Sequence, residues 1–205
     1  MDGAWIRQGG AERVICVFGG WGLGPEAAAG LPCDADLYWL RDYRRLDADL
    51  PDFTGYSSRT LVAWSFGVAA YGHWQAGRKD GFDTRIALCG SPAPVDRRLG
   101  IPPRTYEATQ EGLSQESFAA FASLCYGAPV TPGDVDIAAL GEELTAVKAR
   151  GAAPVVAWDL AVIATQDRIF PPANLRRAFT GTPIREIDAP HVPFATLSRW
   201  EDLLP

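Results

Sequence analysis

The sequence predicts an α/β protein in which one mostly parallel sheet is flanked by helices, as a single domain over residues 1–205. Segments that read as strands alternate along the chain with segments that read as helices. The strand segments are almost continuously apolar, which is typical of a parallel sheet covered on both faces. A length of 205 residues suits one domain with one sizeable core.

The first half of the chain supplies most of the expected strands. The segments Trp5–Arg7 and Arg13–Phe18 are predicted to form a β-hairpin, because Gly9 and Gly10 provide a turn between two short strand-like runs. Further strands are expected over 35–44, 59–64 and 84–90, with a helix over 66–77.

The second half opens with a stretch of different character. Residues 91–133 contain prolines, glycines and two short amphipathic pieces around 118–126, but no strand, so we expect a small helical lid inserted into the domain. Regular order is expected to resume with a helix over 134–151, a strand within 154–167, a helix over 172–180, a strand over 183–190 and a short final helix.

Composition and charge exclude several classes of protein. The formal net charge is −6 and no more than two basic residues are adjacent, which argues against nucleic-acid binding. No export segment and no apolar run of about eighteen residues is present, so no membrane association is expected. The four cysteines are scattered without a CxxC pair and there are only two histidines, which disfavours a zinc site and favours a reduced, cytosolic protein.

The segment 61–68, "LVAWSFGV", places Ser65 between a strand-like run and a helix-like run, with Ala63 and Gly67 two residues to either side. At such a strand–turn–helix elbow the backbone is strained, the serine points up from the sheet edge, and crowding requires small neighbours. We therefore expect Ser65 to be a nucleophile. The alternative is that Ser65 only caps the following helix, since serine is a favoured N-cap residue.

A nucleophilic serine needs a base, and histidine suits that role near neutral pH. His73 lies eight residues into the helix after Ser65, roughly 12 Å along its axis, and is expected at the surface. His191 follows the last strand, in "DAPHVPF", where a loop at the sheet's carboxyl edge could aim its imidazole at Ser65. His191 is therefore the predicted base.

The third member of a triad should follow the preceding strand, and Asp167 in "ATQDRIFPP" occupies that place. Asp188 is a weaker candidate, and Asp159 is expected within the strand region. Hydrolysis also requires backbone N–H donors for the oxyanion, and the glycines of "VFGGWG" (17–22), Gly20 among them, allow a close approach of the backbone. The N–H groups of Trp21 and Phe66 are the expected donors, although a plain tight turn is the alternative reading of these glycines.

Together these motifs resemble the α/β-hydrolase superfamily and, within it, the pimeloyl-[acyl-carrier protein] methyl ester esterases of biotin synthesis of the BioG type. The resemblance rests on "FGGWG", "LVAWSFGV", "GIPP" (100–103), "QDRIFPPAN" (166–174) and "PHVPF" (190–194), which span nearly the whole chain. Ala63 departs from the wider superfamily, which usually has glycine there.

The resemblance implies an esterase that hydrolyses the methyl ester masking the far carboxyl of a pimeloyl chain on acyl carrier protein, and releases methanol. Ser65 would attack, His191 would transfer the proton, Asp167 would orient His191, and no cofactor or metal would be needed. The implied partner is the acyl carrier protein, and the enzyme is expected to act as a cytosolic monomer.

Two groups of side chains could recognise such a substrate. An apolar acyl slot is expected from aromatic and aliphatic residues, although most of them could simply be core. The candidates are Trp21, Trp64, Phe66, Phe118, Phe121, Leu124 and Tyr126. Arg97, Arg98 and Arg104 of the insertion are candidates for binding the acidic carrier, although the neighbouring acids Asp96, Glu107, Glu111 and Glu116 allow a solvated mixed surface instead.

Two other functions stay open at this point. A general short-chain carboxylesterase or acyl thioesterase would use the same residues on a different acyl group. A non-catalytic binding protein on a hydrolase scaffold would normally lack the serine, the histidine or the oxyanion glycines, all of which are present here.

Overall fold

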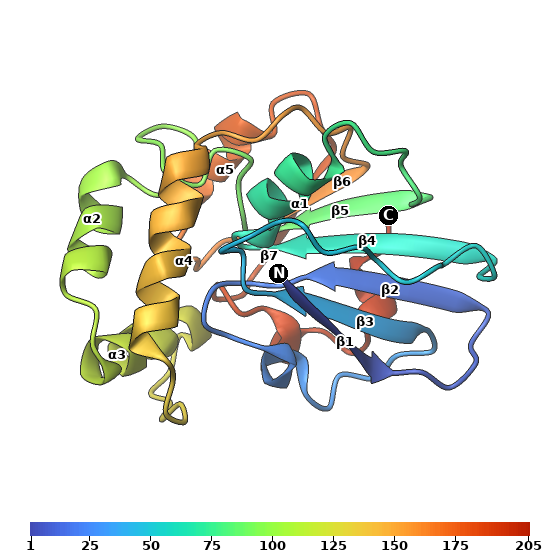
Figure 1. Cartoon of the computed structure of the whole chain (residues 1–205), viewed down its shortest axis with the longest axis horizontal. Coiled ribbons are helices and arrows are strands. Elements are labelled where there is room, and N and C mark those ends of the chain that lie inside the picture. Colours follow the sequence, from blue (N-terminus) through green and yellow to red (C-terminus); the bar gives the residue numbers. More distant parts are fainter.

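The computed structural model describes all residues from 1 to 205 and contains one seven-stranded sheet (Figure 1). The strands are β1 Asp2–Arg7, β2 Arg13–Phe18, β3 Asp36–Arg41, β4 Ser58–Trp64, β5 Thr84–Leu88, β6 Leu160–Ala164 and β7 Ile184–Ile187. They lie in the order β1-β3-β2-β4-β5-β6-β7. All neighbouring pairs are parallel except β1 with β3. The α/β class with a mostly parallel sheet is confirmed.

The predicted hairpin is wrong, because β1 pairs antiparallel with β3 and β3 separates it from β2. The carboxylate of Asp36, at the start of β3, accepts hydrogen bonds from the N–H groups of Gly9 and Gly10 at 2.7 and 3.2 Å. The turn glycines therefore bind the incoming strand instead of closing a hairpin. Burial agrees with this strand order. β1 is largely exposed, as expected for a strand at the edge of the sheet, whereas β3 is buried along most of its length.

The helices and short 3₁₀ turns are η1 Pro25–Ala28, α1 Gly67–Gln75, α2 Pro103–Glu111, α3 Gln115–Tyr126, α4 Ile137–Arg150, α5 Pro172–Ala178, η2 Phe194–Thr196 and η3 Trp200–Leu203. Most helices fall close to their expected positions, but η1 and α2 were not expected, and the two short pieces expected around 118–126 form the single helix α3. None of these helices combines the length and apolar character that crossing a bilayer requires.

Aromatic side chains fill the core on both faces of the sheet. Phe18 at the end of β2 packs against Tyr71 and Trp74 of α1. Trp39 of β3 packs against Phe194 and Trp200 of the two C-terminal 3₁₀ turns. Helix α1 therefore covers one face, and the C-terminal turns cover the other.

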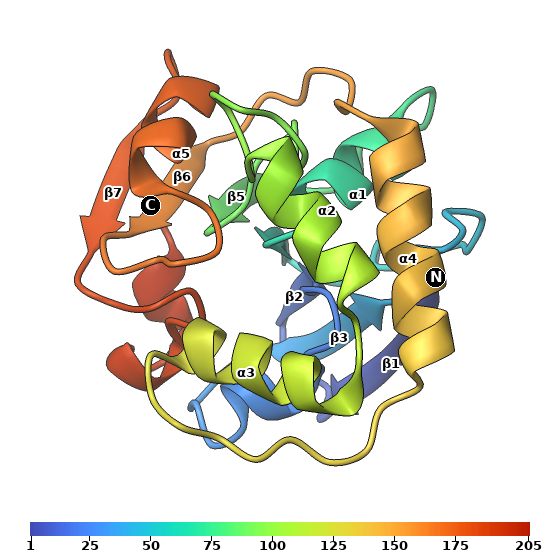
Figure 2. The same ribbon diagram turned by 90° about the vertical axis from the view of Figure 1, so that its left-hand side faces the viewer.

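The chain between β5 and β6 contributes α2, α3 and α4, which gather beyond one end of the sheet (Figure 1). Seen from that end, the three helices surround the ends of the central strands (Figure 2). Within 91–133 the structure has α2, α3 and one isolated bridge between Val95 and Ile101, but no strand. The region predicted as a lid thus contributes two helices, joined by irregular segments, near the ends of the central strands.

Candidate active site

Ser65 lies directly after β4, at the turn into α1, with a φ of 59° in the left-handed region. A non-glycine residue is strained there, as expected for a serine at an elbow. The turn passes so close to its neighbours that a Cβ at Gly67 would lie 2.0 Å from the Phe18 carbonyl oxygen, and one at Gly90 would lie 2.1 Å from that of Ser65. The N-cap residue of α1 is Phe66, so Ser65 does not cap the helix.

The hydroxyl of Ser65 lies 3.0 Å from Nε2 of His191, and Nδ1 of the same ring lies 2.8 Å from Oδ2 of Asp167. All three residues are at most 5% exposed. The other carboxylate oxygen of Asp167 accepts hydrogen bonds from the N–H groups of Ile169 and Phe170 at 2.8 and 2.9 Å. These backbone donors fix the carboxylate so that Oδ2 faces the imidazole, which leaves Nε2 to accept a proton from Ser65.

The loop of His191 is held from several sides. Trp64 donates its indole N–H to the carbonyl of His191 at 3.0 Å, and the ring of Phe170 stacks on the imidazole with centroids 5.9 Å apart. The N–H of Val192 donates to the carbonyl of Cys125 at the end of α3. Burial raises the pKa of the Cys89 and Cys125 thiols, so both stay neutral and add no second negative charge beside Asp167.

The alternative candidates from the sequence lie in other environments. His73 is half-buried and its Nε2 lies 3.3 Å from the carbonyl oxygen of Gly151. Asp188 is hydrogen-bonded to Thr165 and Gln166, not to the imidazole. Asp159 lies just before β6, where its carboxylate binds Arg85. The structure therefore brings together the three residues that the sequence favoured.

The loop after β2 approaches Ser65 closely, since a Cβ at Gly20 would lie 3.3 Å from the Cβ of Ser65. The backbone N–H groups of Trp21 and Phe66 belong to no helix or strand, and neither donates a hydrogen bond within the chain. Unpaired N–H groups beside a serine are available to an incoming oxyanion.

Ser65 opens into a cavity of about 110 Å³ between the sheet edge and the three helices above it. Its lining comprises Trp21, Ser65, Phe66, Ile101, Thr105, Tyr106, Thr109, Phe121, Leu124, Leu144, Arg168 and Ile169. Of the predicted acyl-slot residues, Trp21, Phe66, Phe121 and Leu124 belong to this lining. Phe118 is buried against the edge of Trp21 instead, and neither Trp64 nor Tyr126 lines the cavity.

The residues that α2, α4 and the Asp167 loop contribute to the cavity were not predicted from the sequence. Tyr106 is buried and its hydroxyl donates a hydrogen bond to the carbonyl of Leu144, which joins α2 to α4 in the wall of the cavity. Arg168 is an exposed cation in the wall and forms no ion pair. A signal for Arg168 was available, since it directly follows the predicted acid of the triad.

Arg97, Arg98 and Arg104 are exposed and form no ion pairs with their own chain. Two of the acids that could have neutralised them are engaged elsewhere. Asp96 accepts from the N–H groups of Arg98 and Leu99, and Glu107 pairs with Lys148 at 2.9 Å. The three guanidinium groups are therefore free to meet an external anion.

Comparison with known proteins gives a family match over almost the whole chain. The family model described as "Pimeloyl-ACP methyl esterase BioG" matches residues 1–203. An uncharacterized protein of Haemophilus influenzae is 30% identical over 212 residues, which cover 94% of each chain. A malonyl-[acyl-carrier protein] O-methyltransferase of Bacteroides fragilis is 28% identical over 183 residues, which are 82% of this chain but 36% of that protein. This chain thus spans about a third of the length of the Bacteroides protein.

Solved structures agree with the family match. The crystal structure of selenomethionine BioG from Haemophilus influenzae superimposes with a TM-score of 0.89 at 26% identity, covering 100% of both chains. A bromoperoxidase from Bacillus anthracis gives a TM-score of 0.63 at 16% identity, over 95% of this chain and 90% of that one. An esterase from Exiguobacterium antarcticum gives 0.61 at 13% identity, over 92% and 87%. At these lower identities the likeness shows the fold alone.

Proposed function

The chain belongs to the BioG family of pimeloyl-ACP methyl esterases, and we propose that it cleaves its ester with Ser65 as nucleophile, His191 as base and Asp167 as the group that orients His191. The observation that carries this assignment is the continuous hydrogen-bonded path from Asp167 through both nitrogens of His191 to the Ser65 hydroxyl, which opens into a mainly apolar cavity.

In the first half of the reaction, Nε2 of His191 accepts the Ser65 proton as Oγ attacks the ester carbonyl. The developing oxyanion receives hydrogen bonds from the N–H groups of Trp21 and Phe66, and Asp167 stabilises the imidazolium. The tetrahedral intermediate then collapses, the C–O bond to the methoxy group breaks, and His191 returns its proton so that methanol leaves. An acyl ester on Ser65 remains.

In the second half, His191 removes a proton from a water molecule that attacks the acyl ester. The same two N–H groups receive the second oxyanion, and collapse restores the Ser65 hydroxyl and releases a carboxylate. The apolar walls formed by Phe66, Phe121 and Leu124 suit the methylene chain of a pimeloyl group.

We also propose that the acyl carrier protein docks over the cavity mouth, against Arg97, Arg98 and Arg104, with Arg168 beside the entering acyl chain. Support comes from the exposure of these four cations and from the absence of ion pairs to them in an otherwise acidic chain. The cytosolic location and the monomeric state stay predictions. Four free, buried cysteines support the location.

Steady-state turnover of pimeloyl-carrier methyl ester, measured beside that of a simple short-chain methyl ester, tests this function. The proposal predicts a kcat/KM at least about a hundredfold higher for the carrier-bound ester, because only that substrate both meets Arg97, Arg98 and Arg104 and fills the apolar cavity with its acyl chain. Equal values for both esters would instead favour a general short-chain carboxylesterase.

A further inference from the structure

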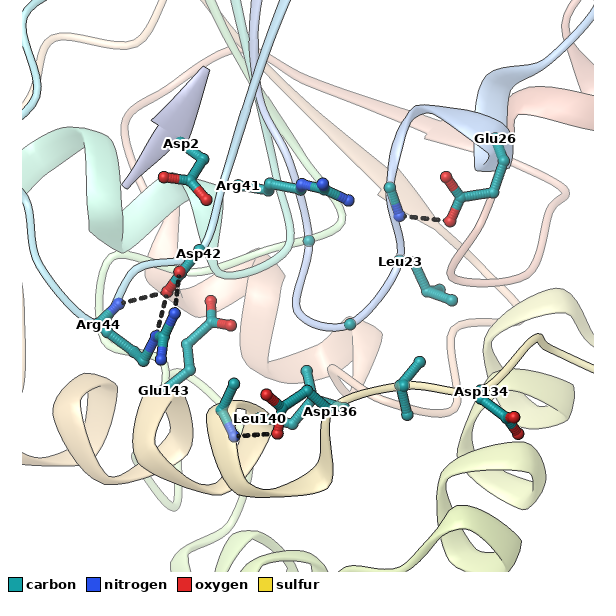
Figure 3. A pocket seen from close by; sticks show the side chains of 15 residues that line it. Asp2, Leu23, Glu26, Arg41, Asp42, Arg44, Asp134, Asp136, Leu140 and Glu143 are labelled. Atoms are coloured by element: carbon teal, nitrogen blue, oxygen red, sulfur yellow. Dashed lines mark hydrogen bonds and ion pairs between the residues drawn. The ribbon is translucent and has the colours of Figure 1, made fainter. Parts of the chain in front are cut away.

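The loop that carries Trp21 borders open space as well as Ser65. Gly20 and Gly22 line a second, polar cavity of about 460 Å³, together with Asp42, Arg44 and Glu143 (Figure 3). The ring of Trp21 packs against Phe118 and Phe121, but the glycines on either side of it have no side chains to pack. Hydrogen bonds therefore help to keep the backbone of this loop in one orientation.

Tyr43 supplies one of these hydrogen bonds. It is completely buried, and its hydroxyl donates to the carbonyl oxygen of Gly19 at 2.9 Å, while its ring stacks on Phe18. The N–H of Gly19 donates to the carbonyl of Leu40 at 2.9 Å. Both backbone groups of Gly19 are thus fixed, and the Gly19 carbonyl lies one peptide before the Gly20–Trp21 peptide that carries the proposed oxyanion donor.

Tyr43 is itself held by its surroundings. Its N–H donates to Oε1 of Glu143 at 3.0 Å, and its carbonyl accepts a hydrogen bond from Arg150 at the end of α4. The preceding residue, Asp42, has a φ of 62° and binds the guanidinium of Arg44 through both carboxylate oxygens, as Figure 3 shows. The turn that presents Tyr43 therefore has little freedom.

The other side of the loop is bound to the same helix. The indole N–H of Trp21 donates to the carbonyl of Leu140 in α4 at 3.1 Å. Helix α4 therefore holds the Gly20–Trp21 peptide from both directions, through Leu140 on one side and through Glu143 and Tyr43 on the other.

We propose that Tyr43 is a positioning residue of the oxyanion hole: its hydroxyl, bonded to Gly19, orients the Gly20–Trp21 peptide so that the Trp21 N–H faces the oxyanion. The inference rests on the proposed function, because it assumes that the Trp21 N–H is a donor. Its effect falls on the transition state, since the ester carbonyl gains full negative charge only there.

The test is Tyr43→Phe, compared with Tyr71→Phe. Tyr71 is also fully buried against Phe18, but its hydroxyl contacts Asp80, so its removal reports the general cost of deleting a buried hydroxyl in this core. Tyr43→Phe should lower kcat about tenfold with KM changed less than twofold, a fraction of the roughly hundredfold or greater cost of losing an oxyanion donor. Tyr71→Phe should retain the native kcat.

Affinity for hexylboronic acid, which forms a tetrahedral adduct on a nucleophilic serine, supplies a second readout. It should weaken by the same factor as kcat in Tyr43→Phe and stay unchanged in Tyr71→Phe. Glu143→Leu, which removes the acceptor for the Tyr43 N–H, should reproduce the loss, and Glu143→Gln, which keeps an acceptor, should restore most of it.

A Tyr43→Phe enzyme with native kcat, or with equal losses in both tyrosine variants, would overturn the inference. Ser65→Ala is assayed in the same series to separate this inference from the proposed function. An inactive Ser65→Ala beside a fully active Tyr43→Phe would reject only the role of Tyr43, whereas an active Ser65→Ala would reject the proposed function itself.

Discussion

The indole N–H of Trp64 donates a 3.0 Å hydrogen bond to the main-chain carbonyl of His191, 127 residues further along the chain. Trp64 is the last residue of β4 and directly precedes Ser65, so this one contact joins the strand that presents the serine to the loop that presents the imidazole. The two rings also lie 5.7 Å apart between centroids. The distance between Ser65 and His191 is therefore set by a rigid, buried side chain.

Replacing Trp64 by phenylalanine should remove this connection. The buried carbonyl of His191 would lose its hydrogen-bond donor, which costs about 1–3 kcal/mol of stability. The loop that carries His191 would also become more mobile. We expect kcat to fall at least about tenfold. Thermal unfolding and steady-state kinetics, with Trp158→Phe as the control, measure both effects. Trp158 makes no hydrogen bond through its indole, and an equal loss of kcat in that variant would show that tryptophan volume alone matters.

Asp167 and Asp188 offer a matched pair of carboxylates near the same loop. Asp167→Asn should lower kcat by roughly 10³ to 10⁴, because the amide no longer accepts from Nδ1 and the imidazole is left in the wrong tautomer. Asp188→Asn should change kcat less than about threefold, since Asp188 bonds only to Thr165 and Gln166. The opposite ranking in a kcat assay would transfer the acid's role to Asp188.

We expect KM for the carrier-bound ester to rise about ten- to a hundredfold when the three arginines of the insertion, Arg97, Arg98 and Arg104, are replaced by alanine. Each exposed contact contributes at most about 1 kcal/mol and is weakened by salt. The variant should also lose the salt dependence of KM, while hydrolysis of a small ester should barely change.

The control for that experiment is a chain in which Arg13, Arg45 and Lys79, which lie outside the insertion, are replaced by alanine. It has the same net charge as the insertion variant. If both variants lose the same affinity for the carrier-bound ester, net charge rather than the insertion surface determines docking.

Glu143 predicts a pH dependence of stability. Burial raises the pKa of Glu143 to about 7 from its usual 4.5; Asp42 raises it further, and the Tyr43 N–H, Arg44 and Arg150 act in the opposite direction. The folded chain therefore holds this proton more tightly than the unfolded chain. The contribution of Glu143 to the free energy of unfolding is fully present below about pH 4.5 and is lost as the pH rises through about 7, by up to about 3 kcal/mol.

Glu143→Gln keeps an acceptor for the Tyr43 N–H and cannot ionise. Denaturant unfolding between pH 4.5 and 8 should show that the variant gains stability over the native chain as the pH rises. A constant difference across this range would mean that Glu143 has an ordinary pKa in the folded chain.

The parallel strands and the elbow could be predicted from the sequence because their signals are local. Apolar runs, the left-handed turn at Ser65 and the small neighbour Gly67 each lie within a few residues. The pairing of β1 could not be predicted in the same way. It depends on Asp36, 26 residues beyond Gly10, whose buried carboxylate draws the turn glycines to β3.

The same distinction separates the predicted site residues from those that were missed. His191 and Asp167 follow strands, and strand ends meet at one edge of a parallel sheet, so their meeting with Ser65 could be inferred from chain order. Tyr106 and Tyr43 donate hydrogen bonds to the carbonyl groups of Leu144 and Gly19, and these contacts depend on how α2, α4 and the turn after β3 pack. No periodicity in the sequence encodes those contacts.

Methanol release from pimeloyl-carrier methyl ester, measured for the native enzyme and for Ser65→Ala, tests directly whether Ser65 is the nucleophile. Circular dichroism and thermal unfolding should first establish that the variant is folded. We expect it to fold, because the substitution removes only one hydroxyl group and leaves the surrounding packing in place. If Ser65 is the nucleophile, kcat of the variant falls at least about 10³-fold. A folded Ser65→Ala enzyme that kept a tenth or more of native turnover would contradict this assignment.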